Sequence, residues 1–514
     1  MGIASAFVYA LAALLFLHSS AAADPLAEKI GVFIDEGPYK HGHWGVLVAD
    51  LGSGDVLFER APDKLFAPAS VTKLYSVAAA LDAFGADYRF ETPIYARGQI
   101  DAEGKLQGDL ILVASGDPTL GGRAGPNGEI AYTNSDHIYG DGAVLTDGDP
   151  LAGLNELAAA VRASGVRHVR GDVLVDDRLF EHARGTGSGP ALLTPIVVND
   201  NLIDVVVTPA TPGSPAKVVC RPVSASLPID AQVETVAAEA PTSVTVASPD
   251  DRCLVIRGQI AAGRKPLLHP QEVADPASFA RSLLIEALRR ADVSIEASPL
   301  AKNQADHLPD RSDYAGMRRV AQLTSPPFSE SARLILKVSH NLHASMLPLL
   351  LATRHEERTL ADGLKHQRQF LIKAGVDADS ISFGGAAGGD PADYVTPRAT
   401  VALLRYMATR DDFAVFDRAL PVLGEDGTLA HAVPAGSPVR GKAQAKTGTM
   451  FWHNRLNGGS ILTSKSLAGY LTAASGRRLA FAVFVNNLPT KTSGDRERIG
   501  KALGQLCEVI FESL

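Results

Sequence analysis

A chain of 514 residues is too long for one ordinary hydrophobic core, so two or more domains are expected. The balance of 46% hydrophobic and 21% charged residues is typical of soluble globular proteins. A net charge of −8 and an isoelectric point near 6.0 give no electrostatic basis for nucleic-acid binding, so no nucleic-acid partner is expected.

The first 23 residues predict an export signal. The apolar run from Phe7 to Leu17 is too short to span a bilayer, and Ala21–Ala23 offers the small residues that a signal peptidase reads. No Lys or Arg precedes the run, so a retained anchor is the alternative. We expect residues 1–23 to be a signal peptide cleaved near Ala23, and the mature protein to be periplasmic and soluble or peripheral at the membrane.

The chain has three cysteines, Cys220, Cys253 and Cys507. An oxidising compartment permits a disulfide, and Cys220 and Cys253 are separated by a plausible loop, so whether these two are bonded is left open. Cys507 lies among apolar residues at helical spacing and is expected to be a buried, unpaired thiol.

The N-terminal part predicts a hairpin and then a helix. Two strands joined at Gly52–Asp55 are expected over residues 43–63, and a largely apolar helix follows from Ser70. From about residue 92 to 265 the residue pattern changes to short runs typical of β-strands, separated by turns rich in Gly, Pro, Asn and Asp, with a helix near 151–163. We interpret residues 92–265 as a β-rich insertion of one or two subdomains.

Helical periodicity returns after the insertion, and strands dominate the last 70 residues before a C-terminal helix. These strands and the N-terminal hairpin are expected to form one antiparallel sheet flanked by helices, an α+β fold. The main domain is therefore predicted to be discontinuous, with residues 24–91 and 266–514. Its expected helices are 275–293, 330–351, 358–374 and 397–409.

The stretch "APASVTKLYSVAAAL" (67–81) places Ser70 and Lys73 one helical turn apart. Residues i and i+3 share a helix face with Cβ atoms about 5–6 Å apart, so a neutral lysine amine can take the serine proton. Burial or a second cation would keep Lys73 neutral. Ser-x-x-Lys recurs at Ser214–Lys217 in a Pro/Gly loop, so the motif alone is not decisive.

Two further motifs follow in order: Ser339-His340-Asn341 and Lys446-Thr447-Gly448. By themselves, the first is typical of a helix cap or turn and the second of a solvated strand. Together with Ser70 and Lys73 they form a complete catalytic set. Ser70 attacks a carbonyl, Lys73 accepts its proton, Ser339 relays the proton to the leaving amine, and Asn341 holds Lys73 or the substrate amide.

The third motif is expected to bind substrate. Lys446 supplies the second cation, which lowers the pKa of Lys73 and binds a carboxylate, and Thr447 adds a hydroxyl. Gly448 lets substrate backbone lie against the strand as an added β-strand. The backbone N–H groups of Ser70 and Thr449 would form an oxyanion hole.

This trio of motifs is shared by class A β-lactamases and penicillin-binding proteins. The chain resembles one branch closely, the D-alanyl-D-alanine carboxypeptidase/endopeptidase family of low-molecular-mass penicillin-binding proteins, the class C type with a large insertion. The first two motifs are 269 residues apart, far more than a β-lactamase needs. The resemblance also rests on "SGDPTL" (115–120), "VVNDNLIDVVVTP" (197–209) and "LPVLGEDGTL" (420–429).

The resemblance implies a penicillin-binding transpeptidase-like fold, similar to that of serine β-lactamases, and a serine acyl-enzyme hydrolase of peptidoglycan stem peptides. Such an enzyme removes terminal D-Ala, can cleave D-Ala–diaminopimelate cross-links, is acylated by β-lactams, and needs neither metal nor cofactor. Two features depart from the family pattern. The turn "FGGAAGGD" (383–390) lacks the usual serine and leucine, and "LHASM" (342–346) lacks an acidic residue.

Other functions remain as alternatives. The altered Gly384–Gly389 turn favours a β-lactam-sensing or scaffolding protein with little turnover, and a β-lactamase would share the chemistry. A Ser-His-Asp hydrolase lacks its Gly-x-Ser-x-Gly elbow, and the His355 segment lacks the second histidine of a zinc peptidase. His340, His343 and His431 are therefore expected to be bystanders. The sequence does not fix the oligomeric state.

Overall fold

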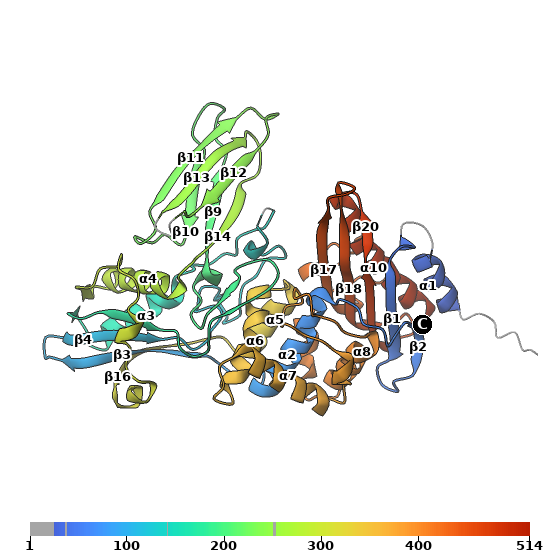
Figure 1. The fold of residues 1–514 in the computed structure, drawn as a ribbon, viewed down its shortest axis with the longest axis horizontal. Helices are drawn as coiled ribbons and strands as arrows, with labels where there is room; N and C mark the ends of the chain where they lie inside the picture. The colour runs from blue at the N-terminus through green and yellow to red at the C-terminus, as the bar shows by residue number, and fades with distance from the viewer. Residues whose placement is uncertain (1–24, 36–38, 141, 250–252) are drawn as a thin grey trace, which may run out of the picture.

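An antiparallel sheet with helices on both faces forms one end of the molecule (Figure 1). The computed structural model describes residues 25–35, 39–140, 142–249 and 253–514, so the expected signal peptide lies outside the described residues. The strand order is β17-β18-β19-β1-β2, and β20 pairs with β18. The bounds are β1 (His43–Asp50), β2 (Val56–Arg60), β17 (Ala443–Asn454), β18 (Gly459–Thr472), β19 (Arg478–Asn486) and β20 (Leu488–Thr490).

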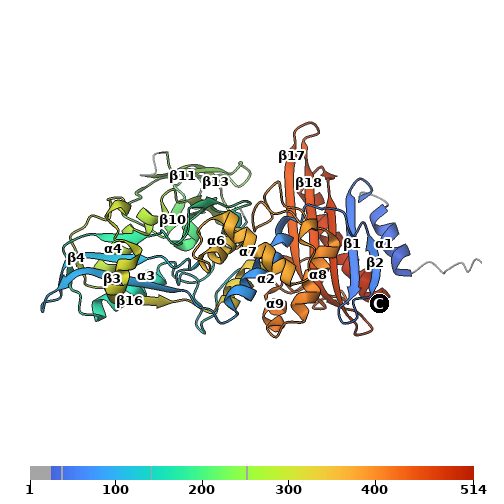
Figure 2. The same ribbon diagram turned by 60° about the horizontal axis from the view of Figure 1, so that its bottom comes forward.

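The pairing confirms that the N-terminal hairpin and the last strands share one sheet. Val46 in β1 pairs with Val483 in β19 on one side and with Arg60 in β2 on the other. The alternate faces of β1 are both buried because helices cover both sides of the sheet. Helices α1 (Pro25–Asp35) and α10 (Ser493–Ser513) cover one side (Figures 1 and 2).

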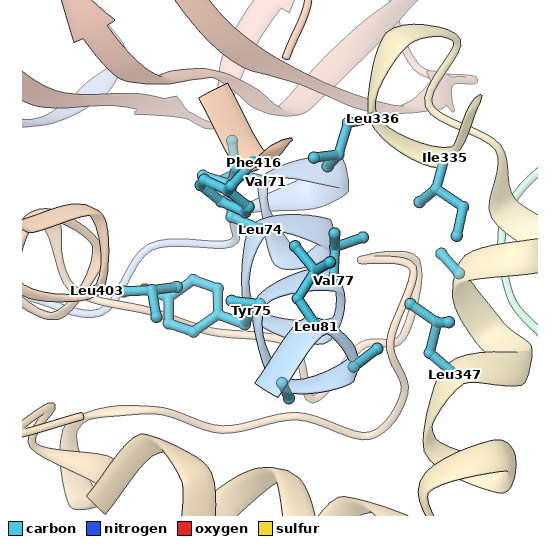
Figure 3. Close-up of a cluster of buried hydrophobic side chains, with 14 of the residues drawn as sticks. Val71, Leu74, Tyr75, Val77, Leu81, Ile335, Leu336, Leu347, Leu403 and Phe416 are labelled. Atoms are coloured by element: carbon cyan, nitrogen blue, oxygen red, sulfur yellow. The ribbon is translucent and has the colours of Figure 1, made fainter. Parts of the chain in front are cut away.

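The other side of the sheet carries the larger hydrophobic core, centred on α2 (Thr72–Phe84). Every residue from Thr72 to Leu81 is buried, so α2 is enclosed on all sides and runs through the core (Figure 3). Each large apolar side chain buried there contributes about 1.5–3 kcal/mol. The surrounding helices are α5 (Phe328–Lys337), α6 (Asn341–Thr353), α7 (Leu360–Lys373), α8 (Pro397–Ala408) and α9 (Phe413–Ala419).

The single helix predicted over 330–351 is wrong, because the structure has two helices there. Helix α5 ends at Lys337 and α6 begins at Asn341. Ser339, between them, adopts a left-handed backbone conformation with φ of 62°, which an α-helix cannot contain. Apolar periodicity continues on both sides of the break, so the sequence pattern alone does not reveal it.

The insertion forms the other end of the molecule (Figure 1). One sheet has the order β15-β5-β4-β3-β16, with β6 paired to β4, and α3 and α4 pack in its core. Two smaller sheets, β10-β9-β14 and β11-β13-β12, extend away from it. The helices are α3 (Ala152–Ala163) and α4 (Pro276–Arg290), and the strands of the first sheet are β3 (Glu91–Ile100), β4 (Lys105–Val113), β5 (His168–Val169), β6 (Val173–Asp176), β15 (Ser294–Ile295) and β16 (Arg318–Thr324).

The remaining strands of the insertion are short or lie in the two smaller sheets. A β-ribbon is made by β7 and β8. The bounds are β7 (Ala183–Arg184), β8 (Leu192–Leu193), β9 (Leu202–Thr208), β10 (Lys217–Arg221), β11 (Ile229–Val236), β12 (Ser243–Ala247), β13 (Leu254–Ala261) and β14 (Leu267–Glu272).

The packing around α4 and β16 bears on the expected boundary of the insertion at residue 266. Strand β16 pairs with β3, with Leu323 opposite Thr92, and Leu284 of α4 belongs to the same buried core as Ile94. We propose that the insertion runs from about residue 91 to 324, because α4 and β16 bury their apolar faces there and not in the main domain.

Among the described residues, no helix combines the length and the apolar character needed to cross a bilayer. Cys220, Cys253 and Cys507 are free thiols. Cys220 lies in β10, whereas Cys253 precedes β13 in a different sheet, so the two are not bonded. Cys507 is buried in α10, where burial raises its pKa to about 12.

We predict that the thermal midpoint of the protein does not change when a reductant is added, because no disulfide holds the insertion together. Alkylation of the denatured, unreduced protein should modify all three cysteines, as counted by mass spectrometry. A protein that takes up one alkyl group before reduction and three after it would contradict the free thiols.

Candidate active site

The three sequence motifs meet at one cleft between the sheet, the core helices and the insertion. The cleft has a volume of about 580 Å³. Its walls come from the turn before α2, the α5–α6 junction, the turn at 387–389, the loop at Thr428, β17 and β18, and two segments of the insertion. The lining includes Ser70, Ser339, Asn341, Thr447, Thr449 and Lys465, with Tyr139, Gly187 and Ser188 contributed by the insertion.

Ser70 lies in a single 3₁₀ turn, η2 (Ala69–Val71), and α2 begins directly after it. Lys73 is therefore in the first turn of α2, and its side chain is fully buried. Lys73 Nζ donates hydrogen bonds to Ser70 Oγ at 2.9 Å, to Asn341 Oδ1 at 2.7 Å and to the Ala387 carbonyl at 2.7 Å. These three acceptors direct the amine at the serine hydroxyl.

The environment of Lys73 prepares it to act as a base. Burial lowers its pKa from the usual value to about 7, although the Asp393 carboxylate acts in the opposite direction. A lysine with such a pKa is largely neutral just above neutral pH, so it can accept the proton of Ser70. Burial is the dominant cause, and the expected contribution from a second cation is not among the causes of the Lys73 pKa shift.

Lys446 and Lys465 place two more amines at the cleft. Burial, together with repulsion from Lys73 and Lys465, holds the pKa of Lys446 well below its usual range. Lys446 Nζ donates to the Thr447 carbonyl at 2.7 Å. Lys465 lies opposite Thr449 across the β17–β18 pair and donates to its hydroxyl at 2.8 Å, and burial lowers the Lys465 pKa to about 8.

Two glycines let the walls of the cleft approach the nucleophile. A Cβ on Gly448 would lie 2.2 Å from Ser466 Oγ and 2.5 Å from the Pro68 carbonyl, so this glycine packs β17 against the Ser70 turn. This packing is a second reason for Gly448, besides the predicted approach of substrate backbone. Gly388 has φ of 89°, and a Cβ there would lie 1.8 Å from the Ala69 carbonyl.

The altered turn at 383–390 forms one wall of the site, and Asp393 anchors it. The Asp393 carboxylate accepts hydrogen bonds from the backbone N–H groups of Gly384 and Asp390, both at 3.0 Å. Burial raises the pKa of Asp393 to about 6 in spite of these hydrogen bonds. The turn delivers the Ala387 carbonyl to Lys73, so it retains a defined place in the site without the family's serine and leucine.

Behind the cleft, a buried network of charges joins the insertion to α6. Asp200 Oδ1 accepts from His343 Nε2 at 2.6 Å, and Asp200 Oδ2 accepts from Arg123 at 2.6 Å and from His137 at 2.7 Å. Although burial opposes ionisation, Arg123 and the histidines hold the pKa of Asp200 well below its usual range. Burial lowers the pKa of His340 to about 4, so its ring is neutral.

Within the described residues, Asp200, His340 and His343 have the spacing of metal ligands, and so do Asp136, His137 and Asp200. Both groups share Asp200, whose two oxygens already accept hydrogen bonds from Arg123, His137 and His343. The pKa of His137 is raised to about 9 because its hydrogen bonds to Asp200 and Asp204 outweigh burial, so it carries a positive charge at neutral pH. The network is therefore explained by the pairing of Asp200 with Arg123 and His137, and His340 and His343 pack against the same carboxylate.

All the residues predicted from the motifs lie at or directly beneath the cleft, while their catalytic roles remain predictions. Ser70, Lys73 and Asn341 are joined by hydrogen bonds, and Ser339, Thr447 and Thr449 line the same space. Other residues that shape the site were not predicted, because none of them belongs to one of the three catalytic motifs. These are Tyr139, Ser188, Asp393, Thr428 and Lys465.

Lys465 and Thr428 had partial sequence signals. The turn after Asn454 sets the β17–β18 register that pairs Lys465 with Thr449. Thr428 lies in "LPVLGEDGTL", and its hydroxyl accepts a hydrogen bond from Thr447 at 2.7 Å. Asp393 and Tyr139 carried no comparable signal.

The fold and the three-motif cleft define the class of protein: a penicillin-binding, serine β-lactamase-like fold. The chain can be superposed on penicillin-binding protein 4 from Haemophilus influenzae with a TM-score of 0.68 at 20% identity, covering 93% of this chain and 98% of that one. A second structure of that protein, complexed with a novel β-lactam, gives a TM-score of 0.66.

The chain belongs to the D-Ala-D-Ala carboxypeptidase 3 (S13) family, which it matches over residues 26–506. It is 28% identical over 497 residues to a D-alanyl-D-alanine carboxypeptidase of Actinomadura sp. strain R39, covering 91% of this chain and 82% of the relative. It is 24% identical to the D-alanyl-D-alanine carboxypeptidase DacB of Haemophilus influenzae, covering 88% and 86%. The chain is therefore a serine-type peptidase of this family.

We predict that kcat/KM for a D-Ala-D-Ala peptide rises with pH through about 7, as Lys73 loses its proton. In Asp393→Asn, the carboxylate that favours the charged lysine is lost, so the pKa of Lys73 falls and the rise moves to lower pH. The pH profile of the variant measures this shift. A rise displaced to higher pH would contradict the assigned influence of Asp393.

Proposed function

We propose that this protein is a serine acyl-enzyme hydrolase that removes the terminal D-Ala of peptidoglycan stem peptides. The observation that carries the proposal is the hydrogen-bond distance of 2.9 Å between Nζ of the buried, readily deprotonated Lys73 and Ser70 Oγ. It pairs a nucleophile with a base inside a cleft. The D-alanyl-D-alanine carboxypeptidases among its relatives support this substrate class.

In the acylation step, Ser70 Oγ attacks the carbonyl carbon of the penultimate D-Ala as Lys73 Nζ takes the hydroxyl proton. The backbone N–H groups of Ser70 and Thr449 stabilise the oxyanion. The bond to the terminal D-Ala then breaks, and the proton passes through Ser339 to the leaving amine. In the second step, Lys73 activates a water that hydrolyses the Ser70 ester and restores the free serine.

The substrate carboxylate has a binding place in this mechanism. Lys446 and Lys465 are amines with lowered pKa, and a bound carboxylate favours their charged forms. The hydroxyls of Thr447 and Thr449 add hydrogen-bond donors beside them. Binding the carboxylate therefore favours the charged forms of these two amines, which hold the substrate beside Ser70.

The same chemistry extends to three finer proposals. A β-lactam carries an equivalent strained amide, so Ser70 would open the ring and retain the acyl group; the β-lactam complex of the Haemophilus protein supports this for the fold. Cleavage of D-Ala–diaminopimelate cross-links needs only a larger leaving amine. Stem peptides and their cross-links lie in the periplasm, and we propose that the chain is exported there.

A slow, β-lactam-sensing protein is the second candidate function, favoured by the departure of the Gly384–Gly389 turn from the family pattern. The position of that turn argues for turnover, because its Ala387 carbonyl binds the catalytic lysine. A β-lactamase would release hydrolysed penicillin instead of keeping it. The three functions predict different products from the same two substrates.

We predict that penicillin G forms a stable adduct with the wild-type protein and none with Ser70→Ala, as detected by intact-protein mass spectrometry. Release of D-Ala from a stem pentapeptide should fall to background in the same variant. The control is Ser214→Ala, which removes the serine of the other Ser-x-x-Lys and should leave both properties unchanged.

Two results would contradict the hydrolase. A lasting adduct on Ser70 without D-Ala release from any stem peptide would identify the sensor. Rapid loss of the adduct, with hydrolysed penicillin accumulating over many turnovers, would identify a β-lactamase.

A further inference from the structure

Tyr139 of the insertion contacts the backbone of Ser339 in the main domain. It ends a short 3₁₀ turn, η3 (His137–Tyr139), and its ring lines the cleft with 41% of its surface exposed. The hydroxyl end is enclosed. It donates to the Ser339 carbonyl at 2.7 Å and shares the same proton with the Val338 carbonyl at 2.9 Å.

The Ser339 backbone needs such a partner. A serine in the left-handed region, here with φ of 62°, is strained and persists only when its surroundings hold it. The carbonyls of Val338 and Ser339 follow the last turn of α5, where helix carbonyls lack partners within the helix. Tyr139 satisfies these groups from outside the main domain.

The buried charge network holds Tyr139 in place. Asp136 forms two hydrogen bonds with Arg123, at 2.8 and 3.0 Å, and His137 bridges Asp200 and Asp204. Asp200 also forms a hydrogen bond with His343, which lies in the first turn of α6, two residues after Asn341. The same network therefore contacts α6. The buried network thus fixes Tyr139 and the Ser339–Asn341 segment relative to each other across the two domains.

The insertion also contacts the other polar residue of this motif. Asn341 Nδ2 donates to the carbonyl and the hydroxyl of Ser188, each at 3.1 Å. Gly187 lies so close that a Cβ would be 2.5 Å from Asn341 Nδ2. The Ser-His-Asn motif is therefore held from the insertion side at both of its polar ends.

We propose that Tyr139 is a positioning residue: its hydroxyl fixes the strained backbone of Ser339 and so sets where the Ser339 side chain stands in the cleft. The inserted module is then a working part of the active site. This inference rests on the proposed role of Ser339 in proton transfer to the leaving amine. The hydroxyl keeps its proton across the working range because its burial raises the pKa of Tyr139.

The ring of Tyr139 faces the cleft, so a direct contact with substrate is the rival explanation. The two explanations separate in Tyr139→Phe, which keeps the ring and removes only the hydroxyl. A positioning hydroxyl acts on the chemical step, whereas a substrate contact made equally in the ground and transition states acts on KM.

The test is the steady-state release of D-Ala from a stem pentapeptide, with active sites titrated by penicillin so that misfolded protein is not counted. In Tyr139→Phe we expect kcat to fall about tenfold, the factor that corresponds to losing roughly one hydrogen bond, with KM unchanged. The matched control is Tyr132→Phe. Tyr132 lies in the same part of the insertion and stacks under Arg333 of α5, but no role in the cleft is assigned to it; this variant should keep the wild-type kcat.

A double-mutant cycle with Ser339→Ala decides whether Tyr139 acts through Ser339. We expect Tyr139→Phe to cause no further loss of kcat once the Ser339 hydroxyl is gone. An unchanged kcat in Tyr139→Phe, an effect on KM alone, an equal loss in Tyr132→Phe, or full additivity with Ser339→Ala would overturn the inference. If Ser339→Ala keeps the wild-type kcat, both the proposed proton relay and this inference are wrong. If Ser339→Ala is impaired but Tyr139→Phe is not, only this inference is wrong.

Discussion

The site depends on the burial of one amine. Lys73 is fully enclosed, and its three acceptors (Ser70 Oγ, Asn341 Oδ1 and the Ala387 carbonyl) come from three separate segments of the chain. A charged ammonium is costly in such a place, so the proton is held loosely and the amine becomes a base near neutral pH. The apolar core around α2 makes this possible because it excludes water from the same helix that carries Lys73.

The insertion and the main domain form one functional unit at the cleft. Asp200 of the insertion accepts hydrogen bonds from both domains, and Tyr139 and Ser188 reach the Ser-His-Asn motif directly. Removing one charged member of such a buried network would destabilise the protein, because its partner would be left as an unpaired buried charge. The large separation between the first two motifs thus allows a second domain to shape the catalytic wall.

Much of the fold could be predicted, because periodicity and turn residues are local signals. The N-terminal hairpin, the C-terminal strands and the helices at 358–374 and 397–409 all appear near their expected positions. The predictions failed where a long-range contact decides the structure. The break at Ser339 depends on partners outside α5 and α6. The place of His340 and His343 in the buried network likewise depends on a distant residue, Asp200, although their prediction as bystanders to the chemistry stands.

The sequence by itself determined the chemistry: a serine, a lysine one turn later, and two further motifs whose order and spacing identify the family. These features can be recognised in the sequence because the reacting groups lie in short motifs. The tertiary structure alone decided how far the Lys73 pKa falls, which carboxylate acts on it, and that Tyr139 and Lys465 share the cleft. These properties depend on burial and on distances between segments remote in the sequence, and no local pattern of residues predicts either quantity.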